Sequence, residues 1–262
     1  MPNFAANLNF LFTEVPFPDR FAAAAEAGFT AVEYLFPYDY PEQELAKRLT
    51  QSGLKQALIN MPAGNWAGGE RGLTCLPDRT VEFRAGIDTA IRYAQALDCS
   101  RVHLVAGLKP ADADPAPYDA AYLDNLRYAA DRLAPHGITA LIEPINQRDV
   151  PGFYLRDTTQ ALAAIEQVGR ENLRLQFDIY HAQVTEGDLA TRIANAIDKV
   201  GHFQIGNPPG RHEPDNGEIN YPYLFDLIDR LGYDGWIGCE YTPAGATADG
   251  LDWGRAFGLK RP

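Results

Sequence analysis

Short apolar runs alternate with longer amphipathic segments along the whole chain, and this alternation limits the fold more than any other feature. Strands are expected at Phe4–Asn9, Ala31–Leu35, Gln56–Asn60, Val102–Val105, Thr139–Glu143, Leu173–Asp178, His202–Ile205 and Trp236–Glu240. Helices are expected between them, at Pro18–Ala27, Pro41–Gln51, Asp78–Leu97, Tyr118–Pro135, Thr158–Val168, Asp188–Val200 and Tyr221–Leu231. Eight such repeats in 262 residues predict an α/β fold, in which residues 1–262 form one (β/α)8 barrel (TIM barrel) rather than an open doubly wound sheet.

The charge of the chain argues against two classes of partner. It has 35 acidic and 23 basic side chains, which give a formal net charge of −12. A surface of this kind repels the phosphates of nucleic acids and anionic lipids, so we expect neither a nucleic acid nor a membrane as a partner. A small anionic substrate is still compatible with it, because a local cation or a metal can dominate inside a pocket.

The cysteines and the amino terminus indicate a cytoplasmic protein. Cys75, Cys99 and Cys239 are odd in number and far apart, which argues against a disulfide framework and against a C-x-x-C zinc site. The segment MPNFAANLNFLFTEVPF lacks the basic flank and the apolar run of a signal peptide. No apolar segment has the length of a membrane span.

Polar side chains stand at the carboxyl ends of four consecutive expected strands. Glu143 ends the fifth strand, Asp178 the sixth and Glu240 the eighth, and Gln204 lies on the seventh. In a barrel these ends build the active site, so the four side chains are expected to meet. Three adjacent carboxylates repel one another, and a divalent cation is the simplest compensation. Because all four ligands are oxygens, the set predicts Mg²⁺ or Mn²⁺ rather than Zn²⁺.

Two histidines and one arginine are expected near the same end of the barrel. His181 follows Asp178 by three residues, and it either orients a substrate oxygen or lies exposed in a loop. His202 shares the strand face of Gln204 one layer deeper, so we interpret it as an interior residue first and a ligand second. Arg211 lies in a Gly/Pro-rich loop, where its guanidinium fork suits a substrate carboxylate.

A second long loop, NMPAGNWAGGERGLTC, follows the third expected strand; it is glycine-rich and contains Trp66, Glu70 and Arg71. We expect it to act as a lid that brings Trp66 and Glu70 to the substrate and excludes water. Its glycines do not form a phosphate-binding loop, because the G-x-x-x-x-G-K-[ST] pattern is absent. The apolar and Tyr-rich loops serve either such a lid or the contact of a homo-oligomer, and the sequence leaves both open.

Covalent catalysis by a serine or cysteine is not indicated. No G-x-S-x-G segment occurs, and strand alternation turns Cys239 to the outside of the barrel. His103, on a strand, and His136, at a helix end, are interpreted as structural.

Seven segments together resemble one known family. They are ANLNFLF, VEYLFPYDY, NMPAGNWAGGERG, LIEPINQRDVPGFY, FDIYHAQ, HFQIGNPPGRHEPDNGEINY and GYDGWIGCEY. From the first strand to the eighth, the chain resembles the hydroxypyruvate isomerases, within the xylose-isomerase-like barrel superfamily. That family interconverts hydroxypyruvate and tartronate semialdehyde, and a close branch isomerises 2-oxo-tetronates.

The resemblance also implies roles for the residues at the strand ends. Glu143 and Glu240 are the proton donor and acceptor pair, and Glu143, Asp178, Gln204 and Glu240 surround a divalent metal. The ketose 3-epimerases of the superfamily are similar in their acids but place a histidine where Gln204 stands, which disfavours a sugar epimerase. The segment WGRAFGLKRP has no counterpart in the resemblance and is given no role.

Two functions of other classes are the alternatives. The apurinic endonucleases resemble the chain in outline, but they need a histidine-rich zinc site and a basic surface, against five histidines and a net charge of −12 here. A sugar-acid-binding protein without catalysis does not need both Glu143 and Glu240.

Overall fold

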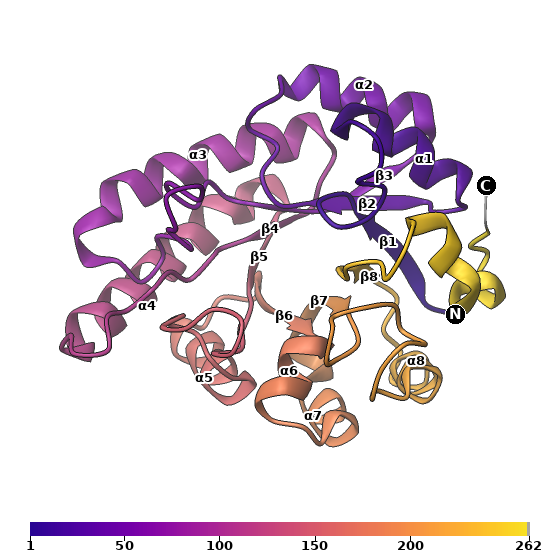
Figure 1. Cartoon of the computed structure of the whole chain (residues 1–262). Helices are drawn as coiled ribbons and strands as arrows, with labels where there is room; N and C mark the ends of the chain where they lie inside the picture. The colour runs from indigo at the N-terminus through magenta and orange to yellow at the C-terminus, as the bar shows by residue number, and fades with distance from the viewer. Residues whose placement is uncertain (261–262) are drawn as a thin grey trace.

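The eight expected strands all form, and they pair in parallel in the order in which they occur in the chain (Figure 1). In the computed structural model, which describes residues 1–260, the last strand also pairs with the first, so the sheet closes and the predicted barrel is confirmed. The strands are β1 (Asn3–Asn7), β2 (Ala31–Tyr34), β3 (Lys55–Asn60), β4 (Arg101–His103), β5 (Thr139–Ile142), β6 (Leu173–Asp178), β7 (Val200–Ile205) and β8 (Trp236–Cys239).

Helices surround the barrel on the outside. They are α1 (Arg20–Glu26), α2 (Glu42–Ser52), α3 (Thr80–Ala96), α4 (Pro115–Leu133), α5 (Thr158–Val168), α6 (Ile179–Thr185), α7 (Leu189–Ala196) and α8 (Tyr221–Arg230). Short 3₁₀ turns are η1 (Phe17–Asp19), η2 (Pro77–Arg79), η3 (Ala134–His136) and η4 (Ile197–Lys199). The bounds of α5 agree with the expected ones, because Asp157 accepts a hydrogen bond from the backbone N–H of Gln160 and Gly169 closes the helix in the left-handed conformation. Helix α6 was not expected.

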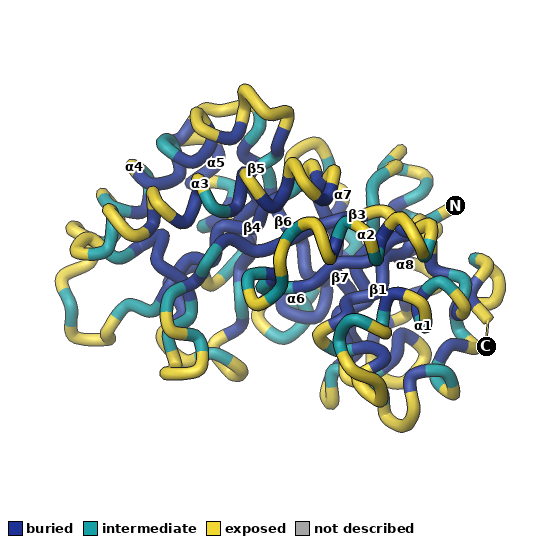
Figure 2. The backbone as a smooth tube through the Cα atoms, turned by 90° about the horizontal axis from the view of Figure 1, so that it is seen from above, coloured by how far each residue is buried: buried dark blue, intermediate teal, exposed yellow. Residues whose placement is uncertain are grey.

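Side-chain alternation along the strands separates an apolar layer from a polar interior. Outward-facing residues such as Val32, Phe177 and Ile237 belong to the core between the sheet and the helices. Their neighbours Glu33 and Gln176 point into the barrel and are fully or almost fully buried there. Figure 2 shows the buried backbone at the centre and the exposed backbone on the outer helices and loops. The barrel interior is thus built for polar contacts.

The carboxyl-terminal segment closes the ring of helices between α8 and α1 (Figure 1). It forms the 3₁₀ helix η5 (Thr247–Phe257), and its Trp253 packs edge-on against Phe4 with ring centroids 5.0 Å apart. The backbone N–H of Lys260 donates to the carbonyl of Ala27, which ties the segment to the end of α1. The segment WGRAFGLK therefore has a structural role, and residues 261–262 lie outside the described part of the chain.

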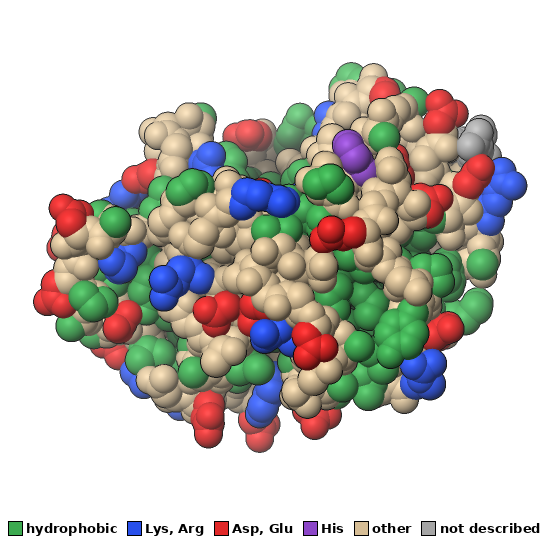
Figure 3. Space-filling view, turned by 60° about the horizontal axis from the view of Figure 1, so that its bottom comes forward, with side chains coloured by type: hydrophobic (Ala, Val, Ile, Leu, Met, Phe, Trp, Pro, Cys, Tyr) green, Lys and Arg blue, Asp and Glu red, His purple; other side chains and the backbone are tan. Residues whose placement is uncertain are grey.

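Acidic, basic and apolar side chains are interspersed over the face of the molecule seen in Figure 3. Among the helices of residues 1–260, none combines the length and the apolar character that a membrane crossing requires.

Candidate active site

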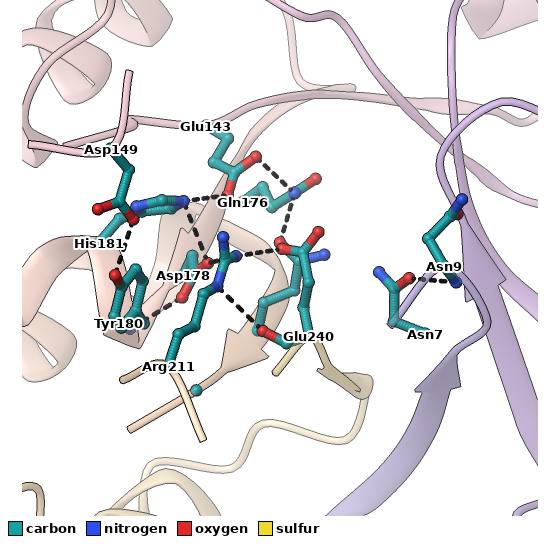
Figure 4. Close-up of polar contacts among 12 residues, drawn as sticks. Asn7, Asn9, Glu143, Asp149, Gln176, Asp178, Tyr180, His181, Arg211 and Glu240 are labelled. Carbon is teal, nitrogen blue, oxygen red and sulfur yellow. Dashed lines mark hydrogen bonds and ion pairs between the residues drawn. The ribbon is translucent and has the colours of Figure 1, made fainter. Parts of the chain in front are cut away.

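Three acids and one amide lie together at the carboxyl ends of β5 to β8, and Figure 4 shows the acids. Glu143 directly follows β5, Asp178 ends β6, Glu240 directly follows β8, and Gln204 lies within β7. The register pairs Asp178 with Gln204, so both side chains are level with each other. All four side chains are buried, which makes the charge of the acids costly unless it is compensated.

Arg211 supplies part of that compensation. Its Nη2 donates to Asp178 Oδ2 at 3.0 Å and to Glu240 Oε2 at 2.8 Å, and its Nε donates to the carbonyl of Glu240 at 3.2 Å. The guanidinium also lies over the rings of Tyr180 and Phe10. The fork that we expected to bind a substrate carboxylate is thus engaged by the acids of the chain itself.

Burial shifts the proton affinities of the acids upward. It raises the pKa of Glu143 well above its usual value, and the neighbouring charges of Glu240 and Asp178 raise it further. Burial raises the pKa of Glu240 to about 8, although Arg211 acts in the opposite direction. The pKa of Asp178 is raised as well, again mainly by burial. At neutral pH such a group of acids holds at least one proton, because like charges this close do not all ionise.

His181 faces the acids from the first turn of α6. Its Nε2 lies 3.5 Å from Asp178 Oδ2 and 3.9 Å from Glu143 Oε1. On the other side of the ring, Nδ1 lies 2.6 Å from the amide nitrogen of Asn146, whose oxygen accepts from the backbone N–H of Asp149. The amide therefore donates to Nδ1, and Nε2 carries the hydrogen. Burial lowers the pKa of His181 well below 6.5, so the ring is neutral and offers an N–H to the pocket.

The donor atoms of this cluster fit a divalent cation. One oxygen from each of Glu143 and Asp178 and one ring nitrogen of His181 lie within 4.8 Å of one another. The two carboxylates are the available ligands, because the His181 nitrogen that faces them carries the hydrogen. Glu143 Oε1 is buried and has no hydrogen-bond partner among residues 1–260, so a carboxylate oxygen points into the cluster without a counter-charge. Gln204 and Glu240, the other two expected ligands, are each held here by hydrogen bonds to other side chains.

A hydrogen-bonded chain connects the acids to the middle of the barrel. Gln176 Nε2 donates to Glu143 Oε2 at 3.0 Å and to Gln204 Oε1 at 2.6 Å, and Gln204 Nε2 donates to Glu33 Oε1 at 2.8 Å. His202 lies 2.6 Å from the second oxygen of Glu33 and is an interior residue, which was our first interpretation of it. Sequence reasoning missed Glu33. The available signal was an acid inside the apolar run AVEYLF.

A cavity of about 130 Å³ opens above the acids. Glu143, Glu240 and His181 line it from the barrel, and Trp66 and Arg71 line it from the loop after β3. Three larger cavities, of about 420, 400 and 220 Å³, contain none of the acids of the site, and the first two lie at the amino-terminal ends of the strands. The small cavity is therefore the one lined by groups that can transfer a proton, and its size suits a molecule of a few carbon atoms.

Glu70 supports the loop that carries Trp66. Its carboxylate pairs with Arg79 at 2.7 Å and accepts a hydrogen bond from the backbone N–H of Asn65 at 2.5 Å. Glu70 is not among the residues that line the cavity, whereas its neighbour Arg71 is. The structure thus places Trp66 at the pocket and Glu70 behind it.

Comparisons with known proteins agree with this fold and with isomerase chemistry. Residues 21–257 match the family model described as xylose isomerase-like TIM barrel. The chain is 53% identical to a 2-oxo-tetronate isomerase of Cupriavidus necator and 49% identical to a hydroxypyruvate isomerase of Escherichia coli. Each match spans 97% of this chain and 97% or 98% of the relative. The crystal structure of AP endonuclease, family 2 from Brucella melitensis superimposes with a TM-score of 0.97 at 48% identity, covering 98% of this chain and 99% of that one.

Proposed function

Because the chain belongs to the xylose isomerase-like TIM barrel family and is an isomerase of the hydroxypyruvate and 2-oxo-tetronate type, we propose that it interconverts hydroxypyruvate and tartronate semialdehyde. The observation that carries the proposal is the pair Glu143 and Glu240, two buried carboxyl groups with raised pKa values that line one small pocket. A proton transfer between adjacent carbons needs one group that accepts a proton and one that returns it.

The reaction moves a hydrogen from C3 to C2 of the acid. One glutamate takes a proton from C3, the C2–C3 bond becomes double, and the carbonyl electrons move to O2. The hydroxyl proton of O3 passes to O2, and a proton from the second glutamate then bonds to C2 while O3 becomes the aldehyde oxygen. Glu240, with a pKa of about 8, is able to hold a proton at neutral pH and to release it. Glu143 and Glu240 thus form the catalytic pair.

The enediolate that forms between the two transfers carries negative charge on its oxygens. A divalent cation, Mg²⁺ or Mn²⁺, held by Glu143 and Asp178 supplies the strongest stabilisation of that charge when it is bound. Gln204 and Glu240 would complete the ligand set that the resemblance implies. His181 donates its Nε2–H to a substrate oxygen, and Arg211 keeps the charge of Asp178 and Glu240 in balance.

The second candidate is a 2-oxo-tetronate isomerase. It is favoured by relatives with that name at 53% and 51% identity. Both acids are small enough for the cavity of about 130 Å³, and they differ by one hydroxymethylene group. A panel of hydroxypyruvate, 2-oxo-tetronates and free ketoses, assayed with metal-stripped protein and again with Mg²⁺ or Mn²⁺ restored, separates these substrates. A ketose as the best substrate contradicts the proposal.

Substitution of the catalytic pair tests the site. Glu143→Gln and Glu240→Gln are each expected to keep the fold and to lower kcat by about 10²- to 10⁴-fold, because each removes one proton-transfer group. Turnover is measured together with circular dichroism and thermal unfolding. Near-normal turnover by either folded variant removes that residue from the mechanism. Absence of solvent proton exchange from labelled substrate in the wild type instead indicates a binding protein.

DNA chemistry is the remaining alternative, since the Brucella melitensis structure carries the name of an endonuclease. With a net charge of −12, the chain is expected to leave DNA unbound at low salt, and a titration with abasic duplex measures this. We also propose a cytoplasmic location, because the three cysteines are free and buried and form no disulfide.

A further inference from the structure

The substrate of the proposed reaction is an anion, and its carboxylate needs a cation at the pocket. Two arginines line the pocket, and Arg211 is already bound to Asp178 and Glu240. The two histidines of the lining face the acids of the site, His103 at 3.6 Å from Glu143 Oε2 and His181 at 3.5 Å from Asp178 Oδ2. The cation that is left among the described lining residues is Arg71 of the loop after β3.

One whole edge of the Arg71 guanidinium is available. Its two hydrogen bonds both leave from Nη1, to the carbonyl of Trp66 at 3.1 Å and to that of Glu70 at 2.8 Å. Within residues 1–260, no hydrogen bond or ion pair uses Nε or Nη2. These two nitrogens form the parallel fork that binds a carboxylate through two hydrogen bonds. The guanidinium also stacks on the ring of Trp66 at 4.4 Å, which limits its rotation.

The backbone on both sides of Arg71 is fixed. On the amino-terminal side, Glu70 is held by Arg79 and by the backbone of Asn65. On the carboxyl-terminal side, Gly72 forms a β-bridge with Ala106, three residues after the end of β4. These contacts on both sides hold the backbone of Arg71 in place.

We propose that Arg71 binds the carboxylate of the substrate through Nε and Nη2 and thereby selects acids over uncharged ketoses. Trp66 and the Glu70–Arg79 pair are positioning residues for it. The proposal rests on the proposed function for the identity of the acid. Carboxylate recognition is thereby assigned to Arg71, in the loop after β3, and not to Arg211, the residue expected from the sequence.

The test compares Arg71→Gln with the wild type. The substitution removes a charge-assisted pair, so KM for hydroxypyruvate is expected to rise by on the order of 10- to 100-fold, while kcat changes by less than about threefold. Arg71→Lys keeps the charge but loses the fork, and it is expected to restore part of the affinity. Arg84→Gln is the matched control, because Arg84 also stacks on an aromatic ring, that of Tyr128, but does not line the pocket.

Binding of pyruvate gives a readout that does not depend on turnover. Pyruvate has the same carboxylate and carbonyl but lacks the hydroxyl that the reaction needs. Its Kd, measured by calorimetry, is expected to rise in Arg71→Gln as KM does, and to stay unchanged in Arg84→Gln. An equal Kd for pyruvate in the wild type and in folded Arg71→Gln overturns the inference. Failure of the proposed function shows separately, as absence of hydroxypyruvate turnover by the wild type.

Discussion

Glu33 illustrates how a single buried carboxyl group organises the polar interior of this barrel. It is fully buried, and its two oxygens accept from Asn7 and Gln204 and contact His202. A Cβ added to Gly238 would lie 2.3 Å from those oxygens, so the glycine of β8 makes the room that the carboxylate occupies. One of these partners, Gln204, continues through Gln176 to Glu143, so Glu33 helps to position a side chain of the site.

His103 is expected to make the protein sensitive to acid. Burial lowers its pKa to about 3, with a further lowering by His202, although Glu143 lies 3.6 Å away. The folded protein therefore binds fewer protons at His103 than the unfolded chain between pH 6.5 and 3, and stability falls as the pH falls through that window. At pH 5 this costs about 2 kcal/mol.

Urea unfolding at pH 7 and pH 5 measures the effect. His103→Gln removes the titrating group, so its free energy of unfolding is expected to fall less between pH 7 and pH 5 than that of the wild type. Equal pH dependence of the free energy of unfolding in the two proteins contradicts a lowered pKa of His103.

The strand-end acids could be predicted from the sequence, but the residues around them could not. Glu143, Asp178 and Glu240 stand where parallel strands end, and one topological rule brings them together. Glu33 lies within an apolar run, and its partners His202 and Gln204 come from a strand far along the chain. The free edge of Arg71 depends on contacts that no local pattern contains. The fold was predictable because hydrophobic periodicity is local, whereas pairing of buried polar groups is not.

At the scale of elements, the loop after β3 is tied to the rest of the chain on both sides of Arg71. The expectation was a glycine-rich segment that closes over the substrate. In the structure, Gly64 and Gly72 have positive φ and bring the loop against its own Glu70 and against the segment that follows β4. Helix α6 shows the same limit of sequence reasoning, because seven residues are too few for a helical period to be visible.

A substitution at Gly72 tests the anchoring of this loop. Its φ is +109°, and a Cβ would lie 2.2 Å from the carbonyl oxygen of Val105, so Gly72→Ala adds a backbone clash to conformational strain. We expect a loss of about 3 kcal/mol or more in unfolding free energy, together with a higher KM. Gly53→Ala is the control, because Gly53 also has positive φ but open space around it, and it is expected to cost about 1 kcal/mol. Equal losses of unfolding free energy in Gly72→Ala and Gly53→Ala contradict the close approach of Gly72 to Val105.

At the scale of the whole molecule, closure of the barrel depends on both ends of the chain. Strand β1 pairs with β8, and η5 covers the junction from outside. Phe4, Phe225 and Trp253 form the aromatic contact there, with Phe4 edge-on to both other rings. The carboxyl-terminal segment, to which the resemblance gave no role, thus covers the contact between β1 and β8.

Trp253→Ala is expected to lower the free energy of unfolding by about 2–4 kcal/mol, because it removes a large ring from a packed contact. Denaturant unfolding at neutral pH measures the loss. Val81→Ala, at a side chain that is 85% exposed, is the control and is expected to change stability by less than about 0.5 kcal/mol. A loss of the same size in both variants contradicts the sealing role of Trp253.

The stacking of Arg71 on Trp66 also gives the molecule an optical property. An indole emits according to the charges and water around its ring, and this ring lies at the mouth of the pocket beneath the guanidinium. Of the other two tryptophans, Trp236 lies at the opposite end of the barrel and Trp253 belongs to the carboxyl-terminal segment. A change in emission when an acid enters the pocket thus comes from one fluorophore, and the protein reports occupancy of its site without a label.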